Sequence, residues 1–144
     1  MKYVNRNIPA NKVFEIVANK GTIDEKVETL KVYDRKDIRW IVDFMYNADK
    51  TGLYVPEYTP SKHAESFTYM TILTAIPKIQ ASLRNRNNKP LYERNLILVL
   101  ENLTSSEAKL IADLFEGKKI EGISKHVFKK VYPNFFREST PEAV

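Results

Sequence analysis

The chain has 144 residues, of which 43% are apolar and 28% charged, the composition of an ordinary globular domain. It contains no cysteine, which excludes a disulfide framework, thiolate catalysis and cysteine-ligated zinc. The formal net charge is +5, and most of the excess lies in residues 73–144, which carry 12 basic and 8 acidic side chains against 11 and 10 in residues 1–72. A polyanion would therefore be attracted mainly to the second half.

No segment predicts secretion or membrane insertion. The N-terminal residues lack the continuous apolar run of a signal peptide. The longest apolar run, Leu96–Leu100, is far shorter than a membrane span. We therefore expect a cytoplasmic protein with no membrane partner.

Apolar residues at helical spacing predict three short helices in the first third of the chain. Asn11 is expected to cap the first helix, which ends at Gly21. Thr22 and Glu25 have the spacing of a capping box and open the second helix. Asp34 is expected to cap the third. The side chains expected to face the core are Val13, Phe14, Ile16, Val17, Ile23, Val27, Leu30, Ile38, Trp40, Ile41, Val42, Phe44 and Met45.

Residues 48–66 form the longest predicted loop, because two prolines and a glycine prevent a regular helix there. Tyr54, Val55 and Tyr58 make this loop unusually apolar. They either fold back onto the core or form a surface that binds a partner, and the sequence leaves both interpretations open.

The middle of the chain predicts helices on both sides of a basic loop. Residues 66–75 are expected to be helical, and Pro77 is expected in the first turn of the next helix. The loop Arg84–Lys89 follows, and Pro90 suits the first turn of another helix. That helix contains the run Leu96–Leu100 and is expected to be buried on most sides. The inward set expected here is Ile76, Ile79, Leu83, Leu91 and Leu96–Leu100.

Two further helices are predicted near the end of the chain. Thr104 and Glu107 form a second capping box, which starts a helix that ends at Gly117. The last helix follows Ser124 and is stopped by Pro133. The inward set of the earlier helix is Ala108, Ile111, Leu114 and Phe115.

These elements together predict an all-α fold. We expect a compact single-domain bundle of about seven to eight short helices over residues 1–144. Its core would occupy residues 11–136, and residues 137–144 would form a frayed tail.

The final helix separates apolar from basic residues. At about 100° per residue, its two sets of side chains fall on opposite arcs. One face is therefore expected to pack and the other to form a basic strip. The apolar arc holds Val127, Phe128, Val131 and Tyr132, and the basic arc holds Lys125, His126, Lys129 and Lys130.

The turn before this helix suits a phosphate. Lys118 and Lys119 flank it, Gly122 lets the backbone approach a ligand closely, and Ser124 can cap the helix or donate to an oxygen. The alternative is that the basic strip is a solvated face, with Gly117 as a helix C-cap and Gly122 as a turn residue. Arg84, Arg86 and Lys89 would provide a second anchor if the fold brings their loop to the same side.

No pattern predicts catalysis, a metal or a cofactor. His63 and His126 are far apart in sequence, and neither has a carboxylate partner at ligand spacing. No nucleophilic triad, GxGxxG or Walker sequence is present. We therefore expect no enzymatic activity, no cofactor, no metal and no small-molecule substrate.

The end of the chain is similar to a known family. Ile120–Ser124 followed by Val127–Pro133 resembles the end of the α-helical N-terminal DNA-binding domain of phage-type ATP-dependent DNA ligases. The resemblance covers most of residues 12–136. Its other parts are Phe14–Val17 before Gly21-Thr22, Tyr33-Asp34-Arg35 at a helix start, Phe67–Leu83 and Leu91–Leu103.

The resemblance implies a non-catalytic bacteriophage protein that binds double-stranded DNA through its backbone, with little dependence on sequence. It assigns that role to Gly122, Ser124, Lys129 and Lys130. Such a protein would serve DNA replication, repair or transcription in the host cytoplasm. The Lys-x-Asp-Gly motif of the ligase nucleotidyltransferase domain does not occur, so the chain looks like the binding module alone.

The alternative function is a protein-interaction adaptor or inhibitor that reuses this fold. Its partner would be a replication or transcription protein. The candidate surfaces are Tyr54, Val55 and Tyr58 in the long loop and the tail from Arg137.

Overall fold

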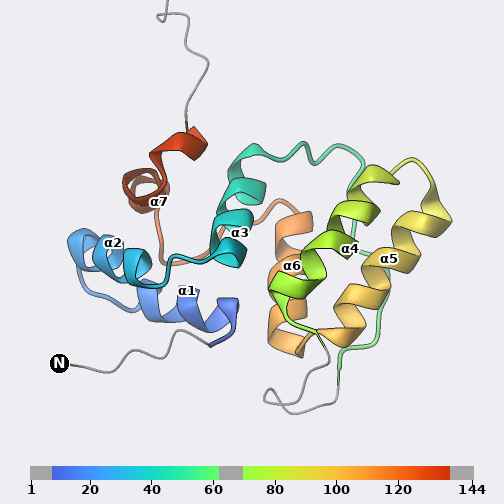
Figure 1. Ribbon diagram of the computed structural model, residues 1–144, viewed down its shortest axis with the longest axis horizontal. Coiled ribbons are helices and arrows are strands. Elements are labelled where there is room, and N and C mark those ends of the chain that lie inside the picture. The colour runs from blue at the N-terminus through green and yellow to red at the C-terminus, as the bar shows by residue number, and fades with distance from the viewer. Residues whose placement is uncertain (1–7, 62–69, 137–144) are drawn as a thin grey trace, which may run out of the picture. The chain divides into compact units, whose positions relative to one another are not determined.

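The computed structural model describes residues 8–61 and 70–136 (Figure 1). Over these residues the fold is all-helical, as the sequence predicts, with seven α-helices, one short 3₁₀ helix and no strand. His63, most of the expected helix over 66–75 and the expected frayed tail lie outside the described residues. Among the described residues, no helix is long and apolar enough to cross a membrane. In chain order the elements are α1 (Ala10–Ala18), α2 (Ile23–Val32), α3 (Lys36–Asn47), α4 (Ile72–Arg84), α5 (Lys89–Asn102), α6 (Ser105–Phe115), α7 (Lys125–Val131) and the 3₁₀ helix η1 (Pro133–Phe136).

The chain divides into two compact units. Of the described residues, the first unit holds residues 8, 12–48 and 120–136, and the second holds residues 9–11, 49–61 and 70–119. The first unit therefore contains α2, α3, α7, η1 and most of α1, while the second contains α4, α5, α6 and the long loop.

Two of the four predicted helix caps are confirmed. Thr22 accepts from the Glu25 amide, and the Glu25 carboxylate accepts from the Thr22 amide, which completes the capping box of α2. Thr104 caps α6 by accepting from the Glu107 amide. Asn11 is not a cap, because α1 already begins at Ala10.

Asp34 is also not a cap, although it precedes α3. The N-cap of α3 is Arg35, whose side chain makes no capping bond. The Asp34 carboxylate instead accepts from Arg39 and from the Tyr132 hydroxyl. A tertiary contact with a residue 98 positions away has replaced the local one.

Aromatic rings hold the core of the first unit together. Phe128 of α7 is fully buried, edge-on to Phe14 at 6.4 Å between ring centroids and tilted against Tyr46 at 5.9 Å. Ile23 was expected in this core but is 46% exposed. As the first residue of α2 its side chain leans beyond the end of the helix, where no preceding turn packs. The buried set of this unit is Val13, Phe14, Val17, Val27, Leu30, Tyr33, Ile38, Ile41, Val42, Phe44, Met45, Ile123, Val127, Phe128 and Tyr132.

α4 is one continuous helix, and the predicted break before Pro77 is wrong. Thr71 and Thr74 form a capping box that starts the helix at Ile72, so Met70 and Thr71 are not helical. Pro77 lies in the second turn, where its missing N–H leaves the carbonyl of Leu73 without its helical donor. Both residues are exposed, so water can satisfy that carbonyl.

α5 packs along α4 and α6 but is not buried on most sides, contrary to the prediction from its apolar run. Its buried stripe consists of Tyr92, Leu96, Val99 and Leu100. Leu91 and Leu98 are 36% and 42% exposed. Within the second unit, α4, α6 and the long loop contact α5, and Leu91 and Leu98 lie outside these contacts.

Candidate nucleic-acid interface

Helix α7 has one buried apolar face and one exposed basic face, as the sequence predicts. Val127 and Phe128 are fully buried and Tyr132 nearly so, which fixes the helix against the core of the first unit. Lys125, His126, Lys129 and Lys130 are all exposed. We call these four residues the α7 strip.

The lysines of the α7 strip are not neutralised by neighbouring acids. No carboxylate among the described residues forms an ion pair with Lys129 or Lys130. The ammonium group of Lys125 lies over the rings of Tyr46 and Phe136, 6.0 Å and 5.8 Å from their centroids. Such cation–π contacts orient the ammonium group and leave its charge in place.

The turn before α7 is shaped by packing within the first unit. Gly122 has φ +82°, and a Cβ there would lie 2.8 Å from the Cβ of Ala18. Its carbonyl accepts from Nζ of Lys26 at 2.7 Å. Glycine is therefore required at this position by the backbone conformation and the close approach of α1, without any ligand.

Ser124 is the N-cap of α7, but its side chain makes no capping bond. α7 has only seven residues, so its aligned peptide dipoles are few. Any anion binding here must depend on the α7 strip rather than on the end of the helix.

Lys118 and Lys119 belong to the second unit. Nζ of Lys118 lies 3.2 Å from Glu116 and 3.6 Å from Asp113, and the hydrogen bond to Glu116 raises the pKa of Lys118. A phosphate at Lys118 would therefore compete with two nearby carboxylates. Gly117, with φ +82°, closes α6 in a Schellman motif: its amide donates to Leu114, and the Lys118 amide donates to Asp113.

The basic loop between α4 and α5 also lies in the second unit. Arg84 and Lys89 are exposed at the two helix ends. The Arg86 side chain donates hydrogen bonds to three backbone carbonyls. Its Nε donates to Leu83, and its Nη1 donates to Asp49 at 2.7 Å and Thr51 at 3.0 Å. Arg86 therefore ties the start of the long loop to the end of α4.

The long loop is irregular over residues 48–61, as predicted, and its apolar part is held on α5. The Tyr54 amide donates to the Tyr92 hydroxyl at 2.9 Å, and the Tyr54 hydroxyl donates to Glu93 at 2.6 Å. The bond to Glu93 raises the pKa of Tyr54 to about 12. The ring of Tyr54 is 37% exposed, while Val55 and Tyr58 are half-buried. These contacts support the first of the two interpretations of the loop, in which it folds back onto its own unit.

A groove of about 430 Å³ lies in the first unit beside α7, and sequence reasoning missed it. Inside it, the Asp34 carboxylate accepts from Nε and Nη2 of Arg39 at 2.8 Å and 2.5 Å and from the Tyr132 hydroxyl at 2.9 Å. The bonds from Arg39 chiefly lower the pKa of Asp34. Burial and the bond to Asp34 raise the pKa of Tyr132. The groove is lined by Lys31, Asp34, Arg39, Val131, Tyr132, Pro133, Asn134 and Phe135.

Among the described residues, no group of three or more His, Asp or Glu side chains could hold a metal ion. Comparison of the chain with protein-family models, with curated proteins and with solved structures finds no match. The likeness to the ligase DNA-binding domain therefore stays a prediction from the sequence.

Proposed function

We propose that the chain binds the backbone of double-stranded DNA through the α7 strip and carries out no catalysis itself. The observation that carries this proposal is the set of exposed cations on a helix whose opposite face is buried, with Lys129 and Lys130 unpaired by any described carboxylate. α7 contains no acid at helical spacing that could pair with these lysines.

The spacing of the strip suits a phosphate backbone. Lys129 follows Lys125 by one turn, about 6 Å along the helix axis. Duplex DNA carries one phosphate per about 3.4 Å of axis on each strand, so several registers bring both ammonium groups near a phosphate. α7 has no Arg, Asn or Gln side chain to form a forked pair of hydrogen bonds with a base edge. Binding is therefore expected to depend little on sequence.

The attraction is local, and we expect modest affinity. The described part of the first unit carries ten basic and eight acidic side chains, so its total charge contributes little. Non-specific DNA complexes of this kind have Kd values of about 10⁻⁴ to 10⁻⁶ M at physiological salt.

The sequence likeness to the ligase DNA-binding domain implies the same function, and it shares Lys129 and Lys130 with the α7 strip. Together they favour a bacteriophage protein that acts on DNA in the host cytoplasm during replication, repair or transcription. The double-stranded DNA would then be its partner, with a replication or transcription protein as a second one.

Charge reversal tests this function. Fluorescence anisotropy of a labelled duplex should show binding by the native chain at low salt and its loss in the double variant Lys129→Glu, Lys130→Glu. Lys78→Glu, Arg94→Glu is the matched control with the same change of charge, because Lys78 on α4 and Arg94 on α5 are exposed in the second unit and form no ion pair with a described residue. An equal loss in the control, or no loss in the double variant, would contradict the assignment to α7.

The same variants distinguish DNA binding through α7 from the alternative function of a protein-interaction adaptor. An adaptor that works through Tyr54, Val55 and Tyr58 should keep its partner when the α7 strip is reversed. The contacts of Tyr54 with Tyr92 and Glu93 engage this loop within its own unit, so no specific observation favours the adaptor.

A further inference from the structure

We propose that the groove beside α7 binds a phosphate ester of a nucleotide. If the phosphate is part of a DNA strand bound by α7, this inference rests on the proposed function. The phosphate chemistry of the groove itself does not depend on it.

The groove is built by three segments of the first unit. Lys31 comes from the end of α2, Asp34 from the turn that follows it and Arg39 from α3, while residues 131–135 come from the end of α7 and from η1. α2 packs against α7 and α3 packs against η1, so the segments that line the groove are held together by packing within the first unit. The cavity of about 430 Å³ is large enough for a phosphate with its sugar.

Arg39 is held in place with part of its guanidinium group unused. Its Nε and Nη2 donate to the two oxygens of Asp34, and Nη1 has no hydrogen-bond partner among the described residues. The Arg39 side chain is 55% exposed. The charges of Asp34 and Arg39 offset each other, so Arg39 offers the groove its free Nη1 donor rather than a net positive charge. An oriented guanidinium with free donors is well suited to a phosphate oxygen.

Lys31 adds a second, movable cation. It lies 3.7 Å from Glu28, and both side chains are more than half exposed. Exposed pairs of this kind are weak, so the ammonium group can exchange Glu28 for a phosphate in the groove.

The apolar wall distinguishes a nucleotide from a bare anion. The ring of Phe135 lies against that of Tyr132 at 5.4 Å between centroids, and Pro133 lines the groove beside them. A sugar or base attached to the phosphate would cover this surface, and a small inorganic anion would leave it uncovered.

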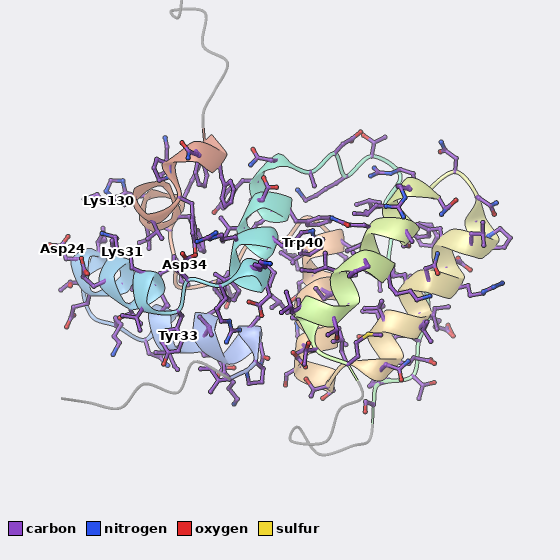
Figure 2. The ribbon with its side chains drawn as sticks, in the orientation of Figure 1. Asp24, Lys31, Tyr33, Asp34, Trp40 and Lys130 are labelled. Atoms are coloured by element: carbon purple, nitrogen blue, oxygen red, sulfur yellow. The ribbon has the colours of Figure 1, made fainter. Side chains whose placement is uncertain are left out.

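The groove begins where the α7 strip ends. Val131 and Tyr132 directly follow Lys130 in the chain. Figure 2 shows Lys130 on α7 above Lys31 on the neighbouring helix α2, with Asp34 to their right in that view. A strand bound along Lys125, Lys129 and Lys130 could therefore place its next phosphate in the groove.

Amide chemical shifts of the full-length ¹⁵N-labelled chain test this inference. The probes are a short DNA duplex, adenosine monophosphate, inorganic phosphate and an acetate control. We expect the amides of Asn134 and Phe135 to shift with the duplex and with adenosine monophosphate, less with inorganic phosphate, and not with acetate. Equal shifts with acetate would overturn the phosphate assignment in favour of a general carboxylate or acidic-peptide site.

A lysine variant gives the second readout. Lys31→Ala should reduce the magnitude of the salt slope of duplex binding by about 0.9, the contribution of one phosphate contact. Lys12→Ala is the matched control, since Lys12 is another exposed lysine that pairs with a glutamate three residues away. Circular dichroism should show that Lys31→Ala and Lys12→Ala both remain folded, because both side chains are exposed.

The outcomes separate this inference from the proposed function. If the duplex binds but the groove amides stay still and Lys31→Ala behaves like Lys12→Ala, the groove assignment is overturned and binding by α7 stands. If the duplex does not bind but adenosine monophosphate shifts the groove amides, the proposed function fails and the groove stands as a site for a free nucleotide.

Discussion

Lys118 and Lys129 occupy the same basic stretch of sequence, yet their electrostatic surroundings differ. Lys118, in the second unit, lies within ion-pair distance of Glu116 and Asp113. Lys129, in the first unit, lies on α7, which has no acidic residue, and no described carboxylate pairs with it. The comparison teaches that a run of lysines indicates a binding surface only where no acidic side chain lies within ion-pair distance.

The largest expected effect concerns the packing that presents the α7 strip. Phe128→Ala should lower the free energy of unfolding by about 3–5 kcal/mol, because it empties a fully buried site between Phe14 and Tyr46. Urea denaturation followed by circular dichroism measures it. Leu98→Ala, at a side chain that is 42% exposed in the second unit, should change stability by less than about 0.5 kcal/mol. Similar losses in both variants would mean that α7 is not anchored as described.

Alanine substitutions at the two glycines that flank the basic turn compare the packing of the two units. Gly122→Ala and Gly117→Ala meet the same backbone strain, because both residues have φ +82°. That strain costs about 1–2 kcal/mol in each. Gly122→Ala should lose more, since its Cβ would lie 2.8 Å from Ala18, whereas a Cβ at Gly117 meets nothing within 4 Å. Equal destabilisation of the two variants in urea would contradict the close approach of α1 to the turn.

Single neutralisations compare the two lysines directly. Lys129→Ala should reduce the magnitude of the salt slope of duplex binding by about 0.9, because one phosphate contact is lost. Lys118→Ala should change the slope less, because a phosphate at Lys118 would first have to displace Glu116 and Asp113. The slopes come from anisotropy titrations at several salt concentrations. A larger change at Lys118 than at Lys129 would reverse the assignment.

The smallest expected effect is a pH dependence in the first unit. Hydrogen bonds from Arg39 lower the pKa of Asp34 below its ordinary value of 3.8, so ionised Asp34 stabilises the fold above that pH. This stabilisation should be lost as the pH falls through the lowered pKa in the folded state. Asp34→Asn should therefore flatten the acid limb of a plot of stability against pH. An unchanged acid limb would show that the Asp34–Arg39 pair contributes nothing.

The features predicted best from the sequence were local ones. Thr22 and Thr104 cap their helices because the partner atoms lie three residues away, at a spacing that the sequence displays. The two faces of α7 follow from helical periodicity in the same way. The role of Asp34 could not be predicted, since the Tyr132 hydroxyl, 98 positions away, reaches its carboxylate only in the folded unit.

Burial around α5 and the groove could not be predicted for a related reason. The run Leu96–Leu100 shows that a helix is apolar but not how many neighbours surround it, and Leu98 remains exposed. The groove combines Lys31, Arg39 and Phe135 from distant segments, and no spacing in the sequence links them. The ion pair of Lys118 with Glu116 could have been found, because the two residues are only two positions apart.

The central claim is that the lysines of α7 neutralise DNA phosphates, and the salt dependence of duplex binding by the native chain tests it most directly. Three phosphate contacts, from Lys125, Lys129 and Lys130, predict that log K falls against log salt concentration with a slope of about −2.7 or steeper. A slope near zero, or no detectable duplex binding at low salt, would contradict it.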